Sequence, residues 1–389
     1  MHTTPNARRY FMARSIYLAA TGLSAASASF SGFAQTTKNT NTTPSRPLLI
    51  AQIVDTSVSQ QDVSKDFLIG ARAAMAIASS DGAVRGRALN HWVLETDGSP
   101  ASAQRAWVSV RDNPQCVALM GTTADPLAMQ ISAWVKQDNV PLAHAAPWLQ
   151  SSQGDLAEGT FGLFANRQQQ IAHAMRSLST LGTKDIAAVF ASASHQQLYA
   201  SEVAAIARKE GLTVQSFTPT TDLTQLGRRL DAKTPAVILF LGGTPELAQL
   251  TQGLDKQARQ RYVVALADVN LQTLRELGAM RSTPIIGTQA VPMVTSSLPL
   301  VRNYRQAMAK LFDEPLNSLS LAGYMAARYT IETIAAVDGT ANRASVLAAF
   351  SRNAVVDLGG LNVAAAKGSN GSPVFVTQTM LTSDGRFVG

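Results

Sequence analysis

One stretch of the chain, residues 115–148, limits the possible folds more than any other. An apolar run from Cys116 to Met120 stops abruptly at Gly121-Thr122-Thr123. Residues 127–135 then carry apolar side chains three and four positions apart, which predicts a helix. A second apolar run, residues 142–146, stops at Pro147-Trp148. Strand, turn, helix and strand in this order make the unit of a parallel sheet, so we expect an α/β fold.

The two strands of this unit are expected to end side by side, each in a loop of small or polar residues. In open α/β sheets, ligands bind at the carboxyl edge of the strands, because helix N-termini and free backbone N–H groups point there. The loops after Met120 and Ala146 are therefore the first candidates for a binding site.

The same alternation of strand and helix continues along most of the chain. Apolar runs predict further strands at residues 48–54, 89–95, 186–190, 214–217, 236–241, 262–266, 285–288 and 374–381. Helical patterns lie between most of them, and three successive helices are expected at residues 298–312, 319–337 and 343–350. A chain of 389 residues suits two domains of ordinary size. The late helices and strand indicate that the chain returns to both domains.

Residues 1–34 have the composition of an export signal. Arg8, Arg9 and Arg14 are the basic residues of an N-terminal segment with an apolar stretch over residues 16–30, and Gly32-Phe33-Ala34 matches a signal-peptidase site. The alternative of a membrane anchor is disfavoured, because the apolar stretch is short and rich in serine. The arginine pair also resembles the twin-arginine export motif. We predict cleavage near Ala34, a disordered spacer over residues 35–47, and a soluble protein in the periplasm.

Charge and composition exclude several classes of function. Residues 1–34 contain no acid, so removal of their three arginines lowers the formal charge from +7 to +4. No Lys/Arg cluster with interleaved aromatic residues remains, and nucleic-acid binding is not expected. Cys116 is the only cysteine and lies in an apolar strand, which predicts a buried, inert thiol. The five histidines lack metal-ligand spacing, so we expect no metal and no cofactor.

Several short sequence motifs occur in an order that is typical of one known protein family. They are Gly70-Ala71, Gly121-Thr122-Thr123, Val140-Pro141-Leu142, Phe240-Leu241-Gly242-Gly243, Gly323-Tyr324-Met325-Ala326-Ala327 and Gly359-Gly360-Leu361. With these landmarks the chain resembles the type I periplasmic solute-binding proteins over residues 48–388. The resemblance is specifically to the leucine/isoleucine/valine-binding branch, which serves ABC importers.

The resemblance implies two α/β lobes, each a parallel sheet flanked by helices, joined by three crossover segments. Lobe 1 would comprise residues 48–164 and 290–358, and lobe 2 residues 165–289 and 359–389. The lobes would close about the hinge over a ligand that touches both. The implied partners are a small-molecule ligand and an ABC permease in the inner membrane, with the binding protein itself a monomer.

The resemblance also places ligand contacts in the two loops of lobe 1. Thr122 and Thr123 stand where the family uses a serine hydroxyl and backbone N–H groups to hold a carboxylate. Asp125 would repel a carboxylate if it faced inward, but its place before Pro126 favours a helix N-terminal residue instead. In the next loop, Ala146 is an implied contact.

Trp148 stands where the family has a threonine. It either offers the ligand a stacking face and an N–H donor or caps the lobe.

In lobe 2, His195 stands where the family often has a tyrosine, with Tyr199 as a rival and a plain surface histidine as the alternative. Thr244 replaces a frequent aromatic residue. The acid that would bind the ligand's ammonium group falls at Asp268 or, in the neighbouring register, at Ala267.

These departures from the family pattern alter both the carboxylate-binding and the ammonium-binding part of an amino-acid site. Burial of a ligand charge without a partner is costly. The expected ligand is therefore an amino acid or an aromatic or other small carboxylate.

Two other functions are possible for such a chain. A periplasmic enzyme is disfavoured, because the sequence has no Gly-x-Ser-x-Gly elbow, no phosphate-binding loop and no convincing Ser/His/Asp set. A ligand sensor of the same fold, which passes its signal to a membrane receptor or regulator, remains the alternative to the transport component.

Overall fold

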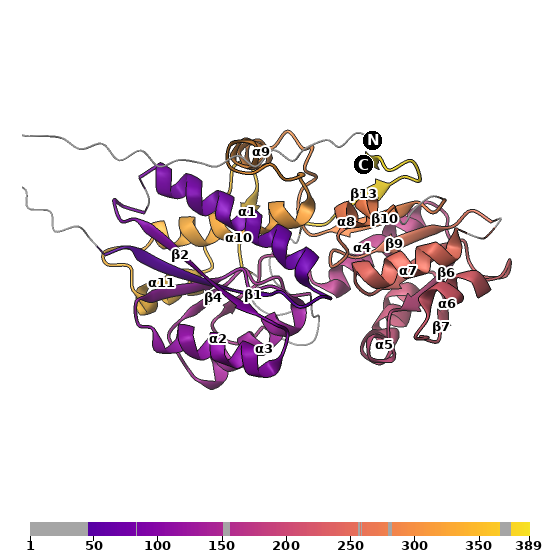
Figure 1. The fold of residues 1–389 in the computed structure, drawn as a ribbon, viewed down its shortest axis with the longest axis horizontal. Helices are drawn as coiled ribbons and strands as arrows, with labels where there is room; N and C mark the ends of the chain where they lie inside the picture. The colour runs from indigo at the N-terminus through magenta and orange to yellow at the C-terminus, as the bar shows by residue number, and fades with distance from the viewer. Residues whose placement is uncertain are drawn as a thin grey trace, which may run out of the picture. The chain divides into compact units, whose positions relative to one another are not determined.

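The structure is a computed structural model that describes residues 46–82, 84–150, 156–255, 257, 259–278, 282–365 and 375–389. The predicted signal peptide and residues 35–45 of the predicted spacer lie outside the described residues. Two large sheets flanked by helices make up most of the described chain (Figure 1), so the predicted α/β class is confirmed. Among the described residues, no helix is long and apolar enough to cross a membrane.

The first sheet has the strand order β2-β1-β3-β4-β5, and all its pairings are parallel. Its strands are β1 (Leu48–Asp55), β2 (Leu89–Thr96), β3 (Cys116–Met120), β4 (Ala143–Ala145) and β5 (Thr160–Phe161). The helices α1 (Gln61–Ser80), α2 (Pro100–Asp112) and α3 (Asp125–Gln137) connect the first four strands. The strand from which the sequence prediction starts, β3, has its predicted bounds.

The second sheet has the order β14-β13-β10-β9-β8-β6-β7. Five strands are parallel: β6 (Asp185–Phe190), β7 (Thr213–Phe217), β8 (Val237–Leu241), β9 (Tyr262–Ala265) and β10 (Ile285–Gln289). The late strands β13 (Thr377–Leu381) and β14 (Phe387–Val388) add to the β10 edge in antiparallel fashion. Its helices are α4 (Arg167–Thr180), α5 (Ala193–Lys209), α6 (Leu223–Arg229), α7 (Thr244–Leu254) and α8 (Leu271–Glu276).

The late helices return to the first sheet. They are α9 (Pro299–Leu311), α10 (Ser318–Ala335) and α11 (Arg343–Ser351). In Figure 1 the orange α10 lies against the indigo α1, although the two are far apart in sequence. Gly70 of α1 and Gly323 of α10 allow this approach, because a Cβ on either would overlap the backbone of the other helix.

A short hairpin, β11 (Val356–Asp357) and β12 (Asn362–Val363), follows the helices. Its Leu361 and Val363 pack against the same core as α10. The lobe boundary proposed at residues 358/359 therefore lies inside this hairpin.

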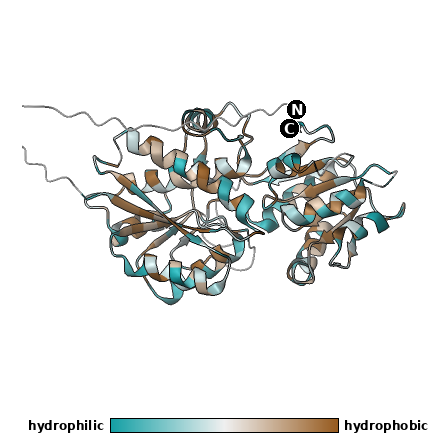
Figure 2. Cartoon of the chain, in the orientation of Figure 1, coloured by the Kyte–Doolittle hydropathy of each residue, from teal (hydrophilic) through white to brown (hydrophobic). Residues whose placement is uncertain are grey.

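Alternate residues of the buried strands belong to different cores. In β1, Leu48 and Ile50 face one cluster, while Ala51 and Ile53 face another on the opposite side of the sheet. The second sheet likewise separates two clusters, with alternate residues of β6 in each. Both faces of each sheet are covered, which explains why the strands read as continuous apolar runs. Figure 2 shows these brown strands between helices that carry teal residues.

Candidate functional site

The residues predicted to bind a ligand all lie in segments that follow a parallel strand. Thr122 and Thr123 follow β3, Ala146 and Trp148 follow β4, His195 lies in the first turn of α5 after β6, and Asp268 follows β9. These positions are the carboxyl edges of the two sheets, where an α/β fold presents backbone donors and helix N-termini.

The hydroxyl groups of Thr122 and Thr123 already have partners within the protein. Both residues are fully buried. The Oγ1 atom of Thr122 lies 3.0 Å from Nε2 of His144, and Oγ1 of Thr123 donates to Oγ of Ser64 over 2.8 Å. Burial lowers the pKa of His144 to about 3, so its ring is neutral at physiological pH. A ligand carboxylate at this loop would have to compete for hydroxyls that are in use.

Trp148 is buried in an aromatic cluster, and only 2% of its surface is exposed. Its ring centroid lies 5.0 Å from that of Phe164 and 5.8 Å from that of Phe67. Its backbone N–H donates to the carbonyl of Thr122, which ties the two loops of the first sheet together. Ala146, two residues earlier, is buried and has a φ of 46°. The aromatic faces of Trp148 are therefore largely occupied by protein.

Asp268 forms an ion pair with Arg167, the first residue of α4. The Nη2 atom of Arg167 lies 3.0 Å from Oδ2 of Asp268 and 3.5 Å from Oδ2 of Asp125. Its Nη1 atom donates to the hydroxyl of Tyr199 over 2.8 Å. Only 5% of the Arg167 side chain is exposed. One guanidinium therefore joins a carboxylate that follows β3 of the first sheet to one that follows β9 of the second.

The electrostatics of this group of charges favour a permanently charged arginine. Burial alone would lower the pKa of Arg167, but the negative charges of Asp268 and Asp125 outweigh it and raise the pKa. Burial lowers the pKa of His195, against the opposing charge of Asp268. The Nδ1 atom of His195 lies 2.7 Å from Oγ of Ser192, which caps α5. With His195 neutral, two carboxylates and one guanidinium leave the group with a net negative charge.

The sequence prediction did not include Arg167, although a signal was present. A positive charge in the first turn of a helix opposes the helix dipole. Arg167 directly follows Asn166, the N-cap of α4, so the helix itself gains nothing from it. Such an arginine indicates an acidic partner elsewhere in the fold. Asp125 does begin α3, as its place before Pro126 predicts.

A second contact joins the two sheets through Asp66 of α1. Its Oδ2 atom accepts hydrogen bonds from Nδ2 of Asn270, over 2.7 Å, and from Nδ2 of Asn317, over 2.8 Å. Asn270 follows β9, and its backbone N–H donates to Oγ1 of Thr244 at the start of α7. Burial raises the pKa of Asp66 to about 6, although the hydrogen bond from Asn270 lowers it.

Asp66→Asn is expected to raise the free energy of unfolding by about 2 kcal/mol at pH 7.5, with a smaller gain at pH 4.5. The pKa of Asp66 is about 6 in the folded protein against an ordinary value of 3.8, so the folded chain binds more protons between these values. The contribution of Asp66 to the free energy of unfolding is therefore fully present at low pH and is lost as the pH rises through 6. Asparagine keeps one oxygen to accept both hydrogen bonds and carries no charge. Urea unfolding at the two pH values measures the difference, and equal gains at both would contradict it.

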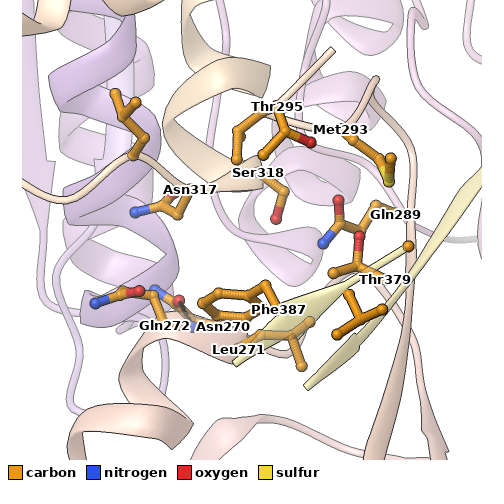
Figure 3. Close-up of a pocket in the computed structure, with 14 residues that line it drawn as sticks. Asn270, Leu271, Gln272, Gln289, Met293, Thr295, Asn317, Ser318, Thr379 and Phe387 are labelled. Atoms are coloured by element: carbon orange, nitrogen blue, oxygen red, sulfur yellow. Dashed lines mark hydrogen bonds between the residues drawn. The ribbon is translucent and has the colours of Figure 1, made fainter. Parts of the chain in front are cut away.

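A separate cavity of about 90 Å³ lies beside this contact (Figure 3). Its wall combines the start of α8, the start of α10, the segment after β10 and the strands β13 and β14. The residues labelled in Figure 3 are Asn270, Leu271, Gln272, Gln289, Met293, Thr295, Asn317, Ser318, Thr379 and Phe387. The wall holds none of the six predicted ligand contacts, and all its side chains are neutral.

Among the described residues, no group of three or more His, Cys, Asp or Glu side chains is placed to hold a metal ion. Cys116 is buried and unpaired, as predicted, and burial raises the pKa of its thiol to about 11.

Comparisons with known proteins agree on the fold. The profile of the periplasmic binding protein family matches residues 47–386. An extracellular ligand-binding receptor from Verminephrobacter eiseniae superposes with a TM-score of 0.77 at 17% identity, covering 88% of this chain and 100% of its own. A branched-chain amino acid ABC transporter protein from Thermus thermophilus with bound valine gives 0.72 at 13% identity, covering 88% and 94%.

An ABC transporter substrate-binding protein from Desulfitobacterium hafniense in complex with Leu gives 0.69 at 15% identity, covering 87% of this chain and 99% of its own. No curated protein sequence matches the chain significantly. The predicted resemblance and the two-lobed fold are therefore confirmed.

Proposed function

The chain belongs to the periplasmic binding protein family, and we propose that it is the exported solute-binding component of an ABC importer. A small organic solute would bind between the carboxyl edges of the two sheets and would favour the closed arrangement of the lobes. A ligand shifts such an equilibrium only through contacts that differ between the two states, so it must touch both lobes.

One observation carries this proposal. Arg167 joins Asp125, which follows β3, to Asp268, which follows β9, so charged groups of both sheets meet at the edge where α/β folds bind ligands. The contact between Asp66 and Asn270 joins the same two edges a second time. Neighbouring structures of the same fold supply the precedent, since two of them hold valine or leucine.

The remaining parts of the proposal follow from the sequence. Residues 1–34 would direct export and be cleaved near Ala34, which would leave a monomer in the periplasm that delivers its solute to an inner-membrane permease. No catalytic role is proposed. The alternative, a sensor that passes its signal to a membrane receptor, would use the same binding event. It gains support from the structural neighbour described as a ligand-binding receptor.

The experiment is a thermal-shift screen of the full chain, expressed with its own export signal and purified from the periplasm. The panel contains branched-chain and polar amino acids, aromatic carboxylates and small amides. A ligand at a hundredfold excess over its dissociation constant adds about 2.7 kcal/mol of stability, and the melting temperature should rise by several degrees. Retention in the cytoplasm, or no shift with any compound, would contradict the proposal. N-terminal sequencing tests cleavage at Ala34.

A further inference from the structure

Two buried N–H donors in the segment after β4 have no acceptor among the residues that the structure describes. They are Nε1 of Trp148 and Nε2 of Gln150, in side chains that are 2% and 1% exposed. No group in the described part of the chain accepts a hydrogen bond from either atom. Folded proteins pair nearly all buried donors, because an unpaired one loses its hydrogen bond to water without replacement. The acceptor for these two donors is therefore expected to come from outside the described residues, and a solute bound at this edge would supply it.

The direction of the Gln150 amide is fixed by its neighbours. The backbone N–H of Ala267 donates to Oε1 of Gln170 over 2.8 Å, so the NH₂ group of Gln170 must point the other way. That NH₂ group donates to the carbonyl of Ala165 and to Oε1 of Gln150. Gln150 therefore uses its oxygen within the protein, and its NH₂ group is left over. The same chain of hydrogen bonds connects Gln150 to the loop after β9.

The acceptors around these donors are already in use. The backbone N–H of Gln150 donates to Oδ1 of Asp125 over 2.7 Å, while Oδ2 of Asp125 and Oδ2 of Asp268 face Arg167. An α-amino acid would need an acid for its ammonium group, and Asp268 is held by the guanidinium. An anionic ligand would meet the excess negative charge of the two carboxylates. Donors without acceptors, next to a net negative charge, suit an uncharged acceptor.

We propose that the solute is an uncharged carbonyl compound with an apolar body, such as a carboxamide. Its carbonyl oxygen accepts hydrogen bonds from Trp148 Nε1 and Gln150 Nε2, and its apolar part lies beside the aromatic cluster that Trp148 forms with Phe67 and Phe164. This inference rests on the proposed function and narrows its ligand class. A carbonyl held by Gln150 also extends the hydrogen-bond chain that reaches Ala267 on the second sheet, which links ligand binding to contact between the lobes.

The test compares uncharged amides with charged probes of similar size. Benzamide is compared with benzoate, and 4-methylpentanamide with leucine, by titration calorimetry on the purified full chain. The two amides are expected to bind at least tenfold more tightly than their charged counterparts. Tighter binding of benzoate or leucine would overturn the proposal.

Three variants separate this site from general stability. Trp148→Phe keeps the aromatic packing but removes one donor, and Gln150→Glu keeps the acceptor for Gln170 but removes the other. Each is expected to weaken benzamide binding about tenfold, the loss of roughly one hydrogen bond. Trp107→Phe is the matched control, because Nε1 of Trp107 donates to Asp138 over 2.7 Å on another side of the sheet. It should lower the melting temperature and leave benzamide affinity unchanged.

The outcomes distinguish the two proposals. If leucine or benzoate binds and neither Trp148→Phe nor Gln150→Glu alters the affinity, the carbonyl site is wrong while the solute-binding function stands. If no probe binds the wild-type chain and the wider panel also fails, both proposals are wrong. Circular dichroism of each variant checks that a lost affinity is not a lost fold.

Discussion

Gly70→Ala is expected to lower the free energy of unfolding by about 3 kcal/mol or more, measured by urea denaturation. A Cβ at Gly70 would lie 1.7 Å from the backbone oxygen of Ser320 and 2.9 Å from the backbone nitrogen of Tyr324. A side chain can rotate away from such an overlap, but a helix backbone cannot. The helices α1 and α10 would have to separate along the first core, which loses packing over a wide area.

Gly339→Ala is the matched control. Gly339 has a φ of 76° and nothing within 4 Å of an added Cβ, so alanine there meets only backbone strain of about 1 kcal/mol. Gly323→Ala should resemble Gly70→Ala, because its Cβ would lie 1.8 Å from the backbone oxygen of Phe67. The double variant should lose less stability than the sum of the two single variants, because both substitutions disrupt the same contact between α1 and α10. A Gly70→Ala cost no larger than that of Gly339→Ala would contradict this account.

Arg261→Met is expected to cost about 3–5 kcal/mol of stability. Arg261 is only 2% exposed, and all its partners are neutral. It donates to Oε1 of Gln257 and to the carbonyl oxygens of Leu230, Asp231, Thr234 and Pro235. Methionine fills part of the volume of the arginine side chain but leaves these acceptors without donors. Each acceptor that water does not reach costs about 1–3 kcal/mol of stability.

Arg259→Met tests whether burial causes the large loss of stability expected for Arg261→Met. Arg259 is exposed and donates to the same carbonyl of Thr234, so its loss should cost less than about 1 kcal/mol. Chemical denaturation of both variants in low and high salt measures the contrast. Because the partners of Arg261 are uncharged, its cost should hardly change with salt. Equal costs for the two variants would show that water replaces the guanidinium.

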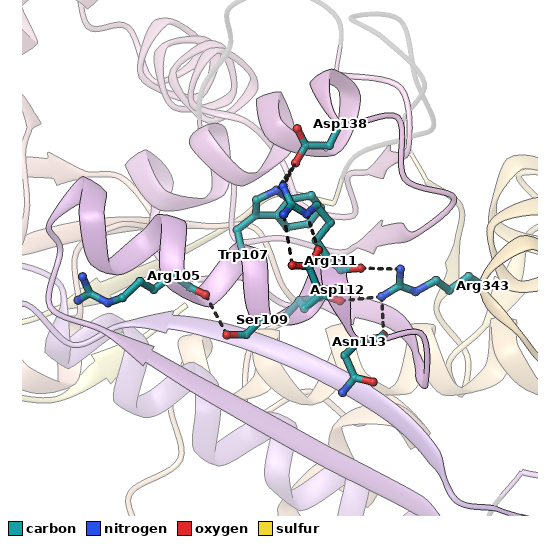
Figure 4. Close-up of polar contacts among 9 residues, drawn as sticks. Arg105, Trp107, Ser109, Arg111, Asp112, Asn113, Asp138 and Arg343 are labelled. Carbon is teal, nitrogen blue, oxygen red and sulfur yellow. Dashed lines mark hydrogen bonds and ion pairs between the residues drawn. The ribbon is translucent and has the colours of Figure 1, made fainter.

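Arg343 likewise donates to several backbone carbonyls, and Figure 4 shows it beside the end of α2. Arg343, at the start of α11, donates hydrogen bonds of 2.6–2.9 Å to the carbonyl oxygens of Val110, Arg111, Asn113 and Cys116. These carbonyls lie at and just beyond the end of α2, where a helix has no internal donors. A residue from the late part of the chain thus completes a helix formed near its beginning.

The sequence predicts the order and type of the elements well, because most of the buried strands are apolar runs, although Gln52 interrupts β1 and Thr288 lies in β10. The start of α1 is less well predicted. The helix begins at Gln61, but most residues before Phe67 are polar, so an apolar helical pattern can be recognised in the sequence only from Phe67. The short strand Thr160–Phe161 has only two residues, too few for a sequence pattern to specify.

The site is less predictable because its contacts join distant positions. Arg167 pairs with Asp125 and Asp268, which are 42 and 101 positions away, and no local pattern specifies such partners. Trp148 is ambiguous for the same reason, since its burial depends on Phe67 and Phe164. The spacing of Trp148 and Gln150 likewise gives no sign that their N–H donors lack acceptors among the described residues, and the orientation of the Gln150 amide depends on the distant Gln170.

The return of α10 to α1 sets an order for folding. The strands β6 to β10 form one continuous stretch of chain, so the inner part of the second sheet has its partners as soon as residue 289 has been synthesised. The first sheet, although synthesised earlier, lacks the helix that covers α1 until residues 318–335 are available, and α2 lacks Arg343 for longer still. Until then the apolar face of α1 lacks its partner helix, so we expect the N-terminal half of the chain to be the part that chaperones bind most during synthesis.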